Sequence, residues 1–180
     1  LVQRRLLCRG VDGRDEVAGS ELCSYSEAKL GADKGDPQKI FEYGMHVEMG
    51  NPFVRPDASK AFALYVTAAE AGYGPASVTV GYCYAYGLGV DKDDKAACEW
   101  YAKAAELGEN GSAQAQNNLG FMHEAGRQPP NFLGLFGAGG PNIDKAIEFY
   151  EKAAAQNNAM AISSLVRLGK KELQPVVQKW

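Results

Sequence analysis

Apolar residues recur at three- and four-residue spacing in three stretches of the chain, residues 57–72, 93–108 and 144–156. Such spacing places the apolar side chains in one stripe along a helix. All three stretches follow one order of residue types: an acid, Lys-Ala, a large apolar residue next to a tyrosine, and then Ala-Ala. The acid before Lys-Ala suits an N-cap, because its side chain can accept hydrogen bonds from the first turn. The pattern therefore predicts three equivalent amphipathic helices.

A shorter apolar segment with a central glycine precedes each of these helices. The intervals from Gly44 to Gly81 and from Gly81 to Gly120 are 37 and 39 residues, and self-similarity at such a period indicates a repeat architecture. Glycine inside a helix costs about 1 kcal/mol relative to alanine. Its recurrence therefore predicts that a second helix crosses closely at this point. Residues 87–90, Gly-Leu-Gly-Val, predict a tight turn between the two helices.

These elements predict an all-α solenoid of about three helix-pair repeats with capping half-units at both ends. Atypical ends are expected, because the terminal units of a solenoid must shield its core. The predicted boundaries are 1–16 for a basic N-terminal arm, 17–169 for the solenoid, about 36–72, 73–108 and 109–156 for its repeats, and 170–180 for a C-terminal tail.

The middle unit carries the most specific motif, which reads Val80-Gly81-x-x-Tyr84-x-x-Gly87-x-Gly89-Val90, then Asp94-Lys95-Ala96, Trp100-Tyr101-x-Lys103-Ala104-Ala105 and Gly108. This motif resembles the consensus of Sel-one-like repeats, a subclass of the tetratricopeptide-like (TPR-like) helical solenoids, and the resemblance covers about residues 36–169. It implies a right-handed α-α superhelix and a non-catalytic role as an adaptor in protein complexes. In the first unit, residues 51–56 replace the Gly-x-Gly-Val turn. This replacement changes a loop and leaves the predicted fold unchanged.

Composition and charge narrow the classes of partner. The 180-residue chain has a net charge of −3. Because nucleic-acid binding needs a basic face, we do not expect nucleic acid as a partner. No run approaches the roughly 18 apolar residues of a transmembrane segment. The first fourteen residues hold four arginines and one acid, and no initiator Met precedes them. This arm is either the remnant of an organellar transit segment, which favours a mitochondrial over a cytoplasmic location, or a short disordered extension.

No catalytic motif is visible. His46 and His123 occupy nonequivalent places in their repeats, and His123 takes the position of Tyr84, which indicates a packing role. The chain lacks the phosphate-binding glycine loop and the Gly-x-Ser-x-Gly elbow of common enzymes. The acids within residues 91–94 suit helix capping and solvation better than calcium binding. We therefore expect no enzyme activity, no bound metal and no cofactor.

The four cysteines form two pairs with the same spacing, Cys8 with Cys23 and Cys83 with Cys98. Cys83 and Cys98 fall at similar heights on two antiparallel helices, so a disulfide is sterically allowed if their Cα atoms lie within about 7 Å. They could equally be two buried thiols that act as small hydrophobes. A disulfide would suit an alternative function, a stabilised assembly factor of the mitochondrial intermembrane space or the secretory pathway.

The third unit contains a long turn, residues 127–143, where the middle unit uses about six residues. Within this turn an apolar cluster stands on a glycine-rich background; its members are Phe132, Leu133, Leu135 and Phe136. An exposed cluster of this kind marks contact with a protein partner or, peripherally, with a membrane surface. The alternative is that the turn folds back over the edge of its own solenoid.

The concave face is the second candidate binding surface, because the first helices of such pairs commonly line it. Tyr82, Tyr86, Asn117 and Asn118 lie off the core face of these helices, where aromatic and amide groups suit peptide recognition. Tyr82 could instead pack between repeats. Together these features predict a protein-protein interaction scaffold or adaptor, and more specifically an accessory subunit of a large organellar complex.

Overall fold

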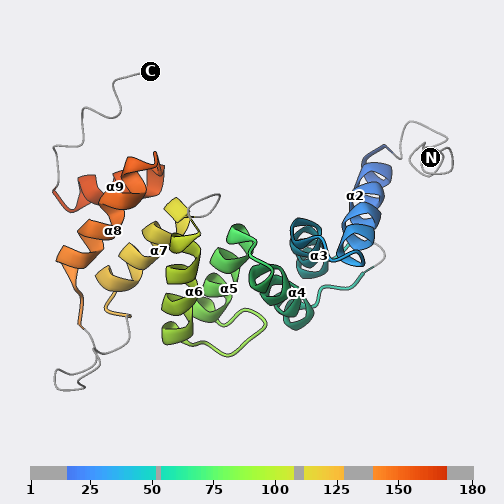
Figure 1. The fold of residues 1–180 in the computed structure, drawn as a ribbon, viewed down its shortest axis with the longest axis horizontal. Helices are drawn as coiled ribbons and strands as arrows, with labels where there is room; N and C mark the ends of the chain where they lie inside the picture. The colour runs from blue at the N-terminus through green and yellow to red at the C-terminus, as the bar shows by residue number, and fades with distance from the viewer. Residues whose placement is uncertain (1–15, 52–53, 108–111, 128–139, 170–180) are drawn as a thin grey trace. The chain divides into compact units, whose positions relative to one another are not determined.

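The computed structural model describes residues 16–51, 54–107, 112–127 and 140–169, together with all side chains of these ranges except those of residues 16–23. Eight helices and no strands occur in these ranges, so the all-α prediction is confirmed (Figure 1). The helices are α2 (Glu16–Ala32), α3 (Pro37–Met49), α4 (Ala58–Glu70), α5 (Gly74–Tyr86), α6 (Asp94–Glu106), α7 (Ser112–Glu124), α8 (Ile143–Ala155) and α9 (Ala159–Arg167). None of the described helices combines the length and the hydropathy that a membrane span requires.

The chain divides into two compact units, residues 1–73 and 74–180. In the first unit α3 packs against both α2 and α4. The ring of Phe41 lies 5.3 Å from that of Tyr65 and 5.4 Å from that of Tyr73, measured between ring centroids. These aromatic contacts join α3 to α4 and to the residue that follows the turn after α4.

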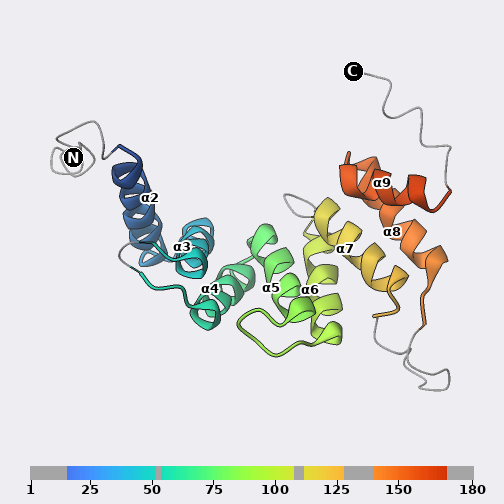
Figure 2. The same cartoon turned by 180° about the vertical axis from the view of Figure 1, so that it is seen from behind.

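In the second unit each helix from α5 to α9 packs against the next one along the chain (Figures 1 and 2). Two clusters of buried residues, most of them small or aromatic, lie in the described part of this unit: Ala85, Ala97, Tyr101, Leu119 and Met122 between α5, α6 and α7, and Ala146, Tyr150, Ala153, Ala154, Ala161 and Leu165 between α8 and α9. Alanines let the helices approach closely, and the tyrosines fill the space that remains.

Short polar side chains start the second helices. The Asp57 carboxylate accepts a hydrogen bond from the Lys60 N–H, and the Asp93 carboxylate accepts from two N–H groups of the first turn of α6. In the third repeat the predicted cap was wrong: Asn142 caps α8, and Asp144 lies inside the first turn. An acid there still interacts favourably with the positive end of the helix dipole.

Each repeated glycine contacts the tyrosine of the second helix. A Cβ atom on Gly44, Gly81 or Gly120 would lie 2.7 Å from a ring carbon of the tyrosine in its pair; these tyrosines are Tyr65, Tyr101 and Tyr150. Carbon atoms at van der Waals contact are about 3.5–4.0 Å apart, so no larger residue fits. The predicted close helix crossing is confirmed at all three positions.

The three interhelix turns differ in length but close in the same way. A backbone N–H at the start of the second helix donates to the carbonyl three residues after the glycine: Asp57 to Val47 at 3.0 Å, Asp93 to Tyr84 at 2.9 Å, and Asn142 to His123 at 2.8 Å. Residues 51–56 and the long third turn are therefore inserted between ends that are already fixed. Insertions of this kind cost little entropy once the ends are held together.

His123 is a packing residue in the structure, as the sequence predicted. Its ring stacks on that of Phe149 with centroids 5.3 Å apart, and its Nδ1 atom is buried without a hydrogen-bond partner. Burial lowers the pKa of His123 below its usual value, and the nearby Lys145 lowers it further. The folded chain therefore favours the neutral imidazole.

We expect Gly81→Ala to lower the free energy of unfolding by about 1 kcal/mol, because overpacking costs about 1–3 kcal/mol and alanine returns about 1 kcal/mol of helix propensity. Urea denaturation followed by circular dichroism measures the change. The control makes the same substitution in a Tyr101→Leu background, where the ring is gone and the cost should shrink. An equal cost in both backgrounds would contradict the proposed contact.

We also expect the stability of the protein to fall as pH drops through the ordinary pKa of histidine, about 6.5. The unfolded chain then takes up a proton that the folded chain binds less readily at His123, because its pKa is lowered there. His123→Tyr, which installs the residue type of Tyr84, should reduce this loss. Thermal unfolding between about pH 7 and pH 5 measures it. An equally steep loss of stability in His123→Tyr and in the wild type would contradict the role of His123.

Candidate functional site

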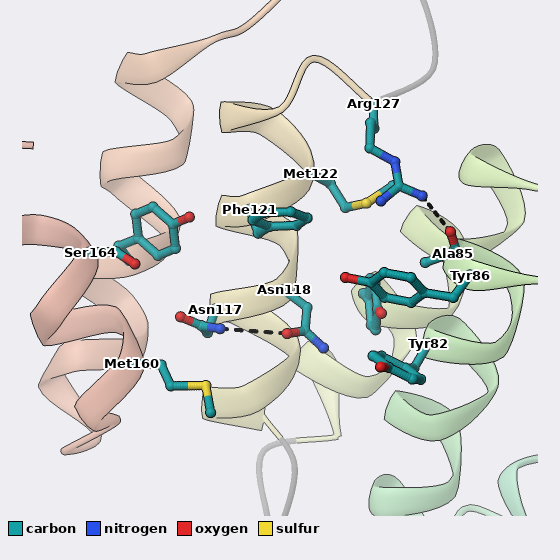
Figure 3. Close-up of a pocket in the computed structure, with 12 residues that line it drawn as sticks. Tyr82, Ala85, Tyr86, Asn117, Asn118, Phe121, Met122, Arg127, Met160 and Ser164 are labelled. Atoms are coloured by element: carbon teal, nitrogen blue, oxygen red, sulfur yellow. Dashed lines mark hydrogen bonds between the residues drawn. The ribbon is translucent and has the colours of Figure 1, made fainter. Parts of the chain in front are cut away.

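A cavity of about 220 Å³ opens in the second unit, between the first helices of consecutive pairs (Figure 3). Helices α5, α7 and α9 contribute most of its wall. The described residues that line it are Tyr82, Ala85, Tyr86, Tyr101, Asn117, Asn118, Phe121, Met122, Arg127, Tyr150, Met160 and Ser164. The lining thus combines aromatic rings and thioethers with two amides, the hydroxyls of Ser164 and the tyrosines, and one guanidinium group.

Two tyrosines of α5 form one wall of the cavity. Tyr82 and Tyr86 lie one helical turn apart, and their ring centroids are 4.4 Å from each other. Both rings are exposed, Tyr82 by 46%. Packing between repeats, the alternative considered for Tyr82, would bury most of this ring. The exposed fraction favours a surface role instead.

The middle repeat lacks a carboxylate that the other two repeats share. Four residues after the glycine the first and third repeats have Glu48 and Glu124, whose carboxylates accept hydrogen bonds from the buried tyrosine hydroxyls at 2.6 and 2.8 Å. The middle repeat has Ala85 at this position. Ala85 and Tyr101 both line the cavity, so no glutamate occupies this part of its wall.

Arg127 enters the same region from the end of α7. Its Nε atom lies 3.1 Å from the Asp94 carboxylate, and its Nη2 atom donates to that carboxylate and to the Ala85 carbonyl. The hydrogen bond to Asp94 raises the pKa of Arg127 above its usual value. The guanidinium carbon lies 5.7 Å from the centre of the Tyr86 ring. Arg127 thereby ties the third repeat to both helices of the second.

Amide side chains form the floor of the cavity on α7. The Asn118 Oδ1 atom accepts hydrogen bonds from Gln114 at 3.1 Å and from Asn117 at 3.5 Å (Figure 3), and the Asn118 side chain also hydrogen-bonds to Tyr101. Asn117 is only 8% exposed, and its Oδ1 atom has no hydrogen-bond partner. Burying an unpaired acceptor costs about 1–3 kcal/mol.

The far side of the cavity is formed by α8 and α9. Met160 is 64% exposed, and Ser164 lies one turn further along α9. The buried Tyr150 hydroxyl donates to Glu124, which also accepts from Arg167 at 2.6 Å. Hydrogen bonds from Arg167 and Tyr150 lower the pKa of Glu124. The charges on this side are therefore neutralised by each other.

The structure brings together four of the residues selected from the sequence, Tyr82, Tyr86, Asn117 and Asn118. Their binding role stays a prediction. Phe121 was missed, although it follows Gly120 as Tyr82 follows Gly81, so the repeat period could have identified it. Arg127 and Met160 carry no such signal, and the repeat pattern marks Tyr101 and Tyr150 only as core residues.

The apolar cluster of the long turn lies outside the described residues. Phe132, Leu133, Leu135 and Phe136 all fall within 128–139. Contact with a partner, a membrane surface or the solenoid's own edge therefore stays a prediction for these four residues.

Cys83 and Cys98 are thiols in the structure, so the disulfide that the sequence left open is not formed. Cys83 is buried and Cys98 is partly buried. Burial and the nearby Asp94 raise the pKa of the Cys98 thiol to about 11. Because the thiolate is the reactive form, Cys98 is a poor nucleophile at neutral pH. Among the described residues no group of His, Cys, Asp and Glu is arranged to hold a metal ion.

We expect both cysteines to alkylate slowly in the native protein and fully after denaturation without reductant. Burial protects Cys83 from the reagent, and the raised pKa keeps Cys98 protonated. Iodoacetamide labelling at about pH 8 followed by peptide mapping measures both sites. A Cys83–Cys98 linked peptide in the unreduced, denatured sample would contradict the expectation.

Comparison with known proteins gives the same architecture. The family model of the Sel1 repeat matches residues 40–73, 79–109 and 113–158. A crystal structure of a Sel1 repeat protein from Oxalobacter formigenes is similar at 32% identity and a TM-score of 0.61, over 79% of this chain and 96% of that one. A protective antigen of uropathogenic Escherichia coli strains, which displays the Sel1-like repeat (SLR) fold, is similar at 29% identity and a TM-score of 0.66. The similarity covers 78% of this chain and 27% of that one.

Two curated relatives are much longer than this chain. The component HRD3A of an ERAD-associated E3 ubiquitin-protein ligase from Arabidopsis thaliana is 38% identical over 76 residues, which are 42% of this chain and 11% of that protein. The chitin synthase regulator SKT5 from Saccharomyces cerevisiae is 33% identical over 94 residues, 52% of this chain and 14% of that protein. The chain thus spans a small part of the length of each relative. The family model and the two solved structures confirm the predicted solenoid fold.

Proposed function

The chain belongs to the Sel1 repeat family, and we propose that it is a non-catalytic scaffold that binds a protein partner through the cavity face of α5, α7 and α9. The names of two relatives support a role beside other proteins, since one is a component of a ubiquitin ligase and the other a regulator of chitin synthase. Because the chain matches only small parts of both proteins, we do not assign their partners to this chain.

The observation that carries the proposal is the grouping of exposed aromatic rings with amides around one cavity. Tyr82, Tyr86 and Phe121 are large apolar side chains left exposed on neighbouring helices. Aromatic residues dominate the energetically important positions of protein interfaces, and they bring contact area at a low cost in side-chain entropy. Asn117 and Asn118 add hydrogen-bonding groups that can read a peptide backbone.

The size of the cavity favours a protein partner over a small-molecule substrate. Pockets for small molecules and cofactors measure about 300–1,000 Å³, whereas this one measures about 220 Å³. The lining holds no cysteine, histidine or carboxylate among the described residues, so the Ser164 hydroxyl has no histidine or carboxylate beside it in the lining to activate it as a nucleophile.

The finer proposal is an accessory subunit of a large complex, with the apolar cluster of the long turn as a second contact. Arg127 lines the cavity and directly precedes residues 128–139 in the sequence, so a partner bound at the cavity would lie near the start of the long turn. The organellar location rests on features of the sequence, chiefly the basic arm of residues 1–16. The alternative, a disulfide-stabilised assembly factor, is disfavoured by the buried thiols of Cys83 and Cys98.

The proposal predicts that a photo-crosslinking residue captures the partner at position 82 and not at position 107. Tyr82 and Leu107 are both 46% exposed, but only Tyr82 lines the cavity. Benzoylphenylalanine at each position, irradiation in native extract and mass spectrometry of the adducts give the readout.

Substitution then tests whether the captured partner depends on the cavity. The double change Tyr86→Ser with Phe121→Ser should weaken co-purification at least about tenfold, because hot-spot residues contribute about 2 kcal/mol or more each. Leu107→Ser is the matched control and should leave it unchanged. Equal capture at positions 82 and 107, or unchanged co-purification of the double variant, would contradict the proposed face.

A further inference from the structure

We propose that the cavity face of α5, α7 and α9 binds an uncharged segment of a partner protein and excludes segments that would place a charged side chain against it. This inference rests on the proposed function and defines the chemistry that its binding face selects. Three observations carry it: these helices hold almost no charged residues, the few charges that border the cavity are paired, and the side chains exposed there are apolar.

The first helices of the second unit are almost free of charged residues. α5 has none, and α7 and α9 have one each besides the neutral His123, namely Glu124 and Arg167. The second helices α6 and α8 have five charged residues each. The repeat itself does not require this division, because α3, the first helix of the first unit, also carries several charged residues. The lack of charge is therefore particular to the helices that line the cavity.

The charges that do border the cavity are already paired. Arg167 contacts the Glu124 carboxylate with both Nη atoms, at 2.6 and 2.8 Å. Arg127, the only charged residue in the described lining, donates to the Asp94 carboxylate and to the Ala85 carbonyl. A charged side chain of a partner would lose its hydration here without meeting a free counter-ion. This loss is strongly unfavourable for either sign of charge.

Amides supply polar groups of α7, and they are bound to neighbouring amides. Gln114 donates to Asn118 at 3.1 Å, and Gln116 accepts from Gln156 at 2.8 Å. The large side chains that line the cavity and remain exposed are apolar or aromatic: Tyr82, Tyr86, Phe121 and Met160 (Figure 3). Charged residues make up about a quarter of an ordinary soluble domain, and they are depleted at the centre of protein interfaces. This face therefore has the composition of an interface centre.

Met160 gives a direct test of charge selection, because it lines the cavity and is 64% exposed. Met160→Glu and Met160→Lys should each lower co-purification of the partner captured at position 82 at least about tenfold, since an interfacial charge without a counter-ion is strongly unfavourable. Met160→Gln, which has the size of glutamate without its charge, should retain most of the binding. Equal unfolding temperatures of the three variants would show that the fold is intact.

Val166 is the matched control position. It lies on the same helix and is 58% exposed, but it does not belong to the described lining. Val166→Gln, Val166→Glu and Val166→Lys should leave co-purification unchanged. A similar loss at both positions would reveal a general effect of charge on the chain and would contradict the inference.

The partner segment gives an independent readout. Mass spectrometry of the adduct at position 82 identifies the captured residue, and we expect no Lys, Arg, Asp or Glu there or directly beside it. A synthetic peptide of this segment should bind no more weakly in about 1 M than in about 0.1 M NaCl, whereas binding through ion pairs would weaken as the Debye length falls from about 10 to about 3 Å.

Opposite effects of Glu and Lys at position 160 would assign the face to a charged partner and overturn the inference. Unchanged binding of both variants, an equal loss with Met160→Gln, a charged captured segment or weaker peptide binding in high salt would overturn it as well. An adduct between two copies of the chain would assign the face to self-association instead. Capture of a partner at position 82 with any other contradicting result would retain the proposed function and reject this selectivity. No capture at position 82 would reject both.

Discussion

The contact between a helix glycine and a tyrosine ring is the constraint on which each repeat depends. At Gly44, Gly81 and Gly120 the space of a missing Cβ atom is taken by the ring of the partner helix. The glycine gives up helix propensity, and the buried ring more than offsets it with apolar area and close packing. Because the ring must lie across the first helix, its hydroxyl reaches the residue one turn beyond the glycine. The contact therefore also decides which side chain has to satisfy that hydroxyl.

That next position is where the repeats diverge and where the cavity arises. A glutamate there accepts the hydrogen bond of the tyrosine hydroxyl within the same repeat, as Glu48 does for Tyr65 and Glu124 for Tyr150. Ala85 leaves the Tyr101 hydroxyl to a neighbouring repeat, where the Asn118 side chain takes it. Burial raises the pKa of Tyr101 well above its usual value, so the hydroxyl stays neutral. One small residue thus turns a packing position into part of a site.

The sequence predicts the fold much better than the site. Period and residue type are local signals, and they were sufficient for the helix pairs, the close crossings and the exposed Tyr82 and Tyr86 wall. The cap of α8 was predicted wrongly, because two acceptable capping residues stand close together and only the backbone geometry decides between them. Arg127 and Met160 could not be found, since their place at the cavity depends on how repeats stack and not on the sequence within one repeat.

Asn117 shows how a repeat protein can acquire specificity without losing its scaffold. Its position is apolar in the other two repeats, and an amide there leaves one acceptor unpaired. Proteins tolerate such a cost when the stability that remains is sufficient, and functional sites are where local rules of packing are most often broken. The regular positions of the solenoid hold the helices at fixed distances, so the irregular ones can be exposed to a partner. In this chain the departures at Ala85, Asn117 and Arg127 meet at one cavity, and their convergence is the strongest argument that it binds something.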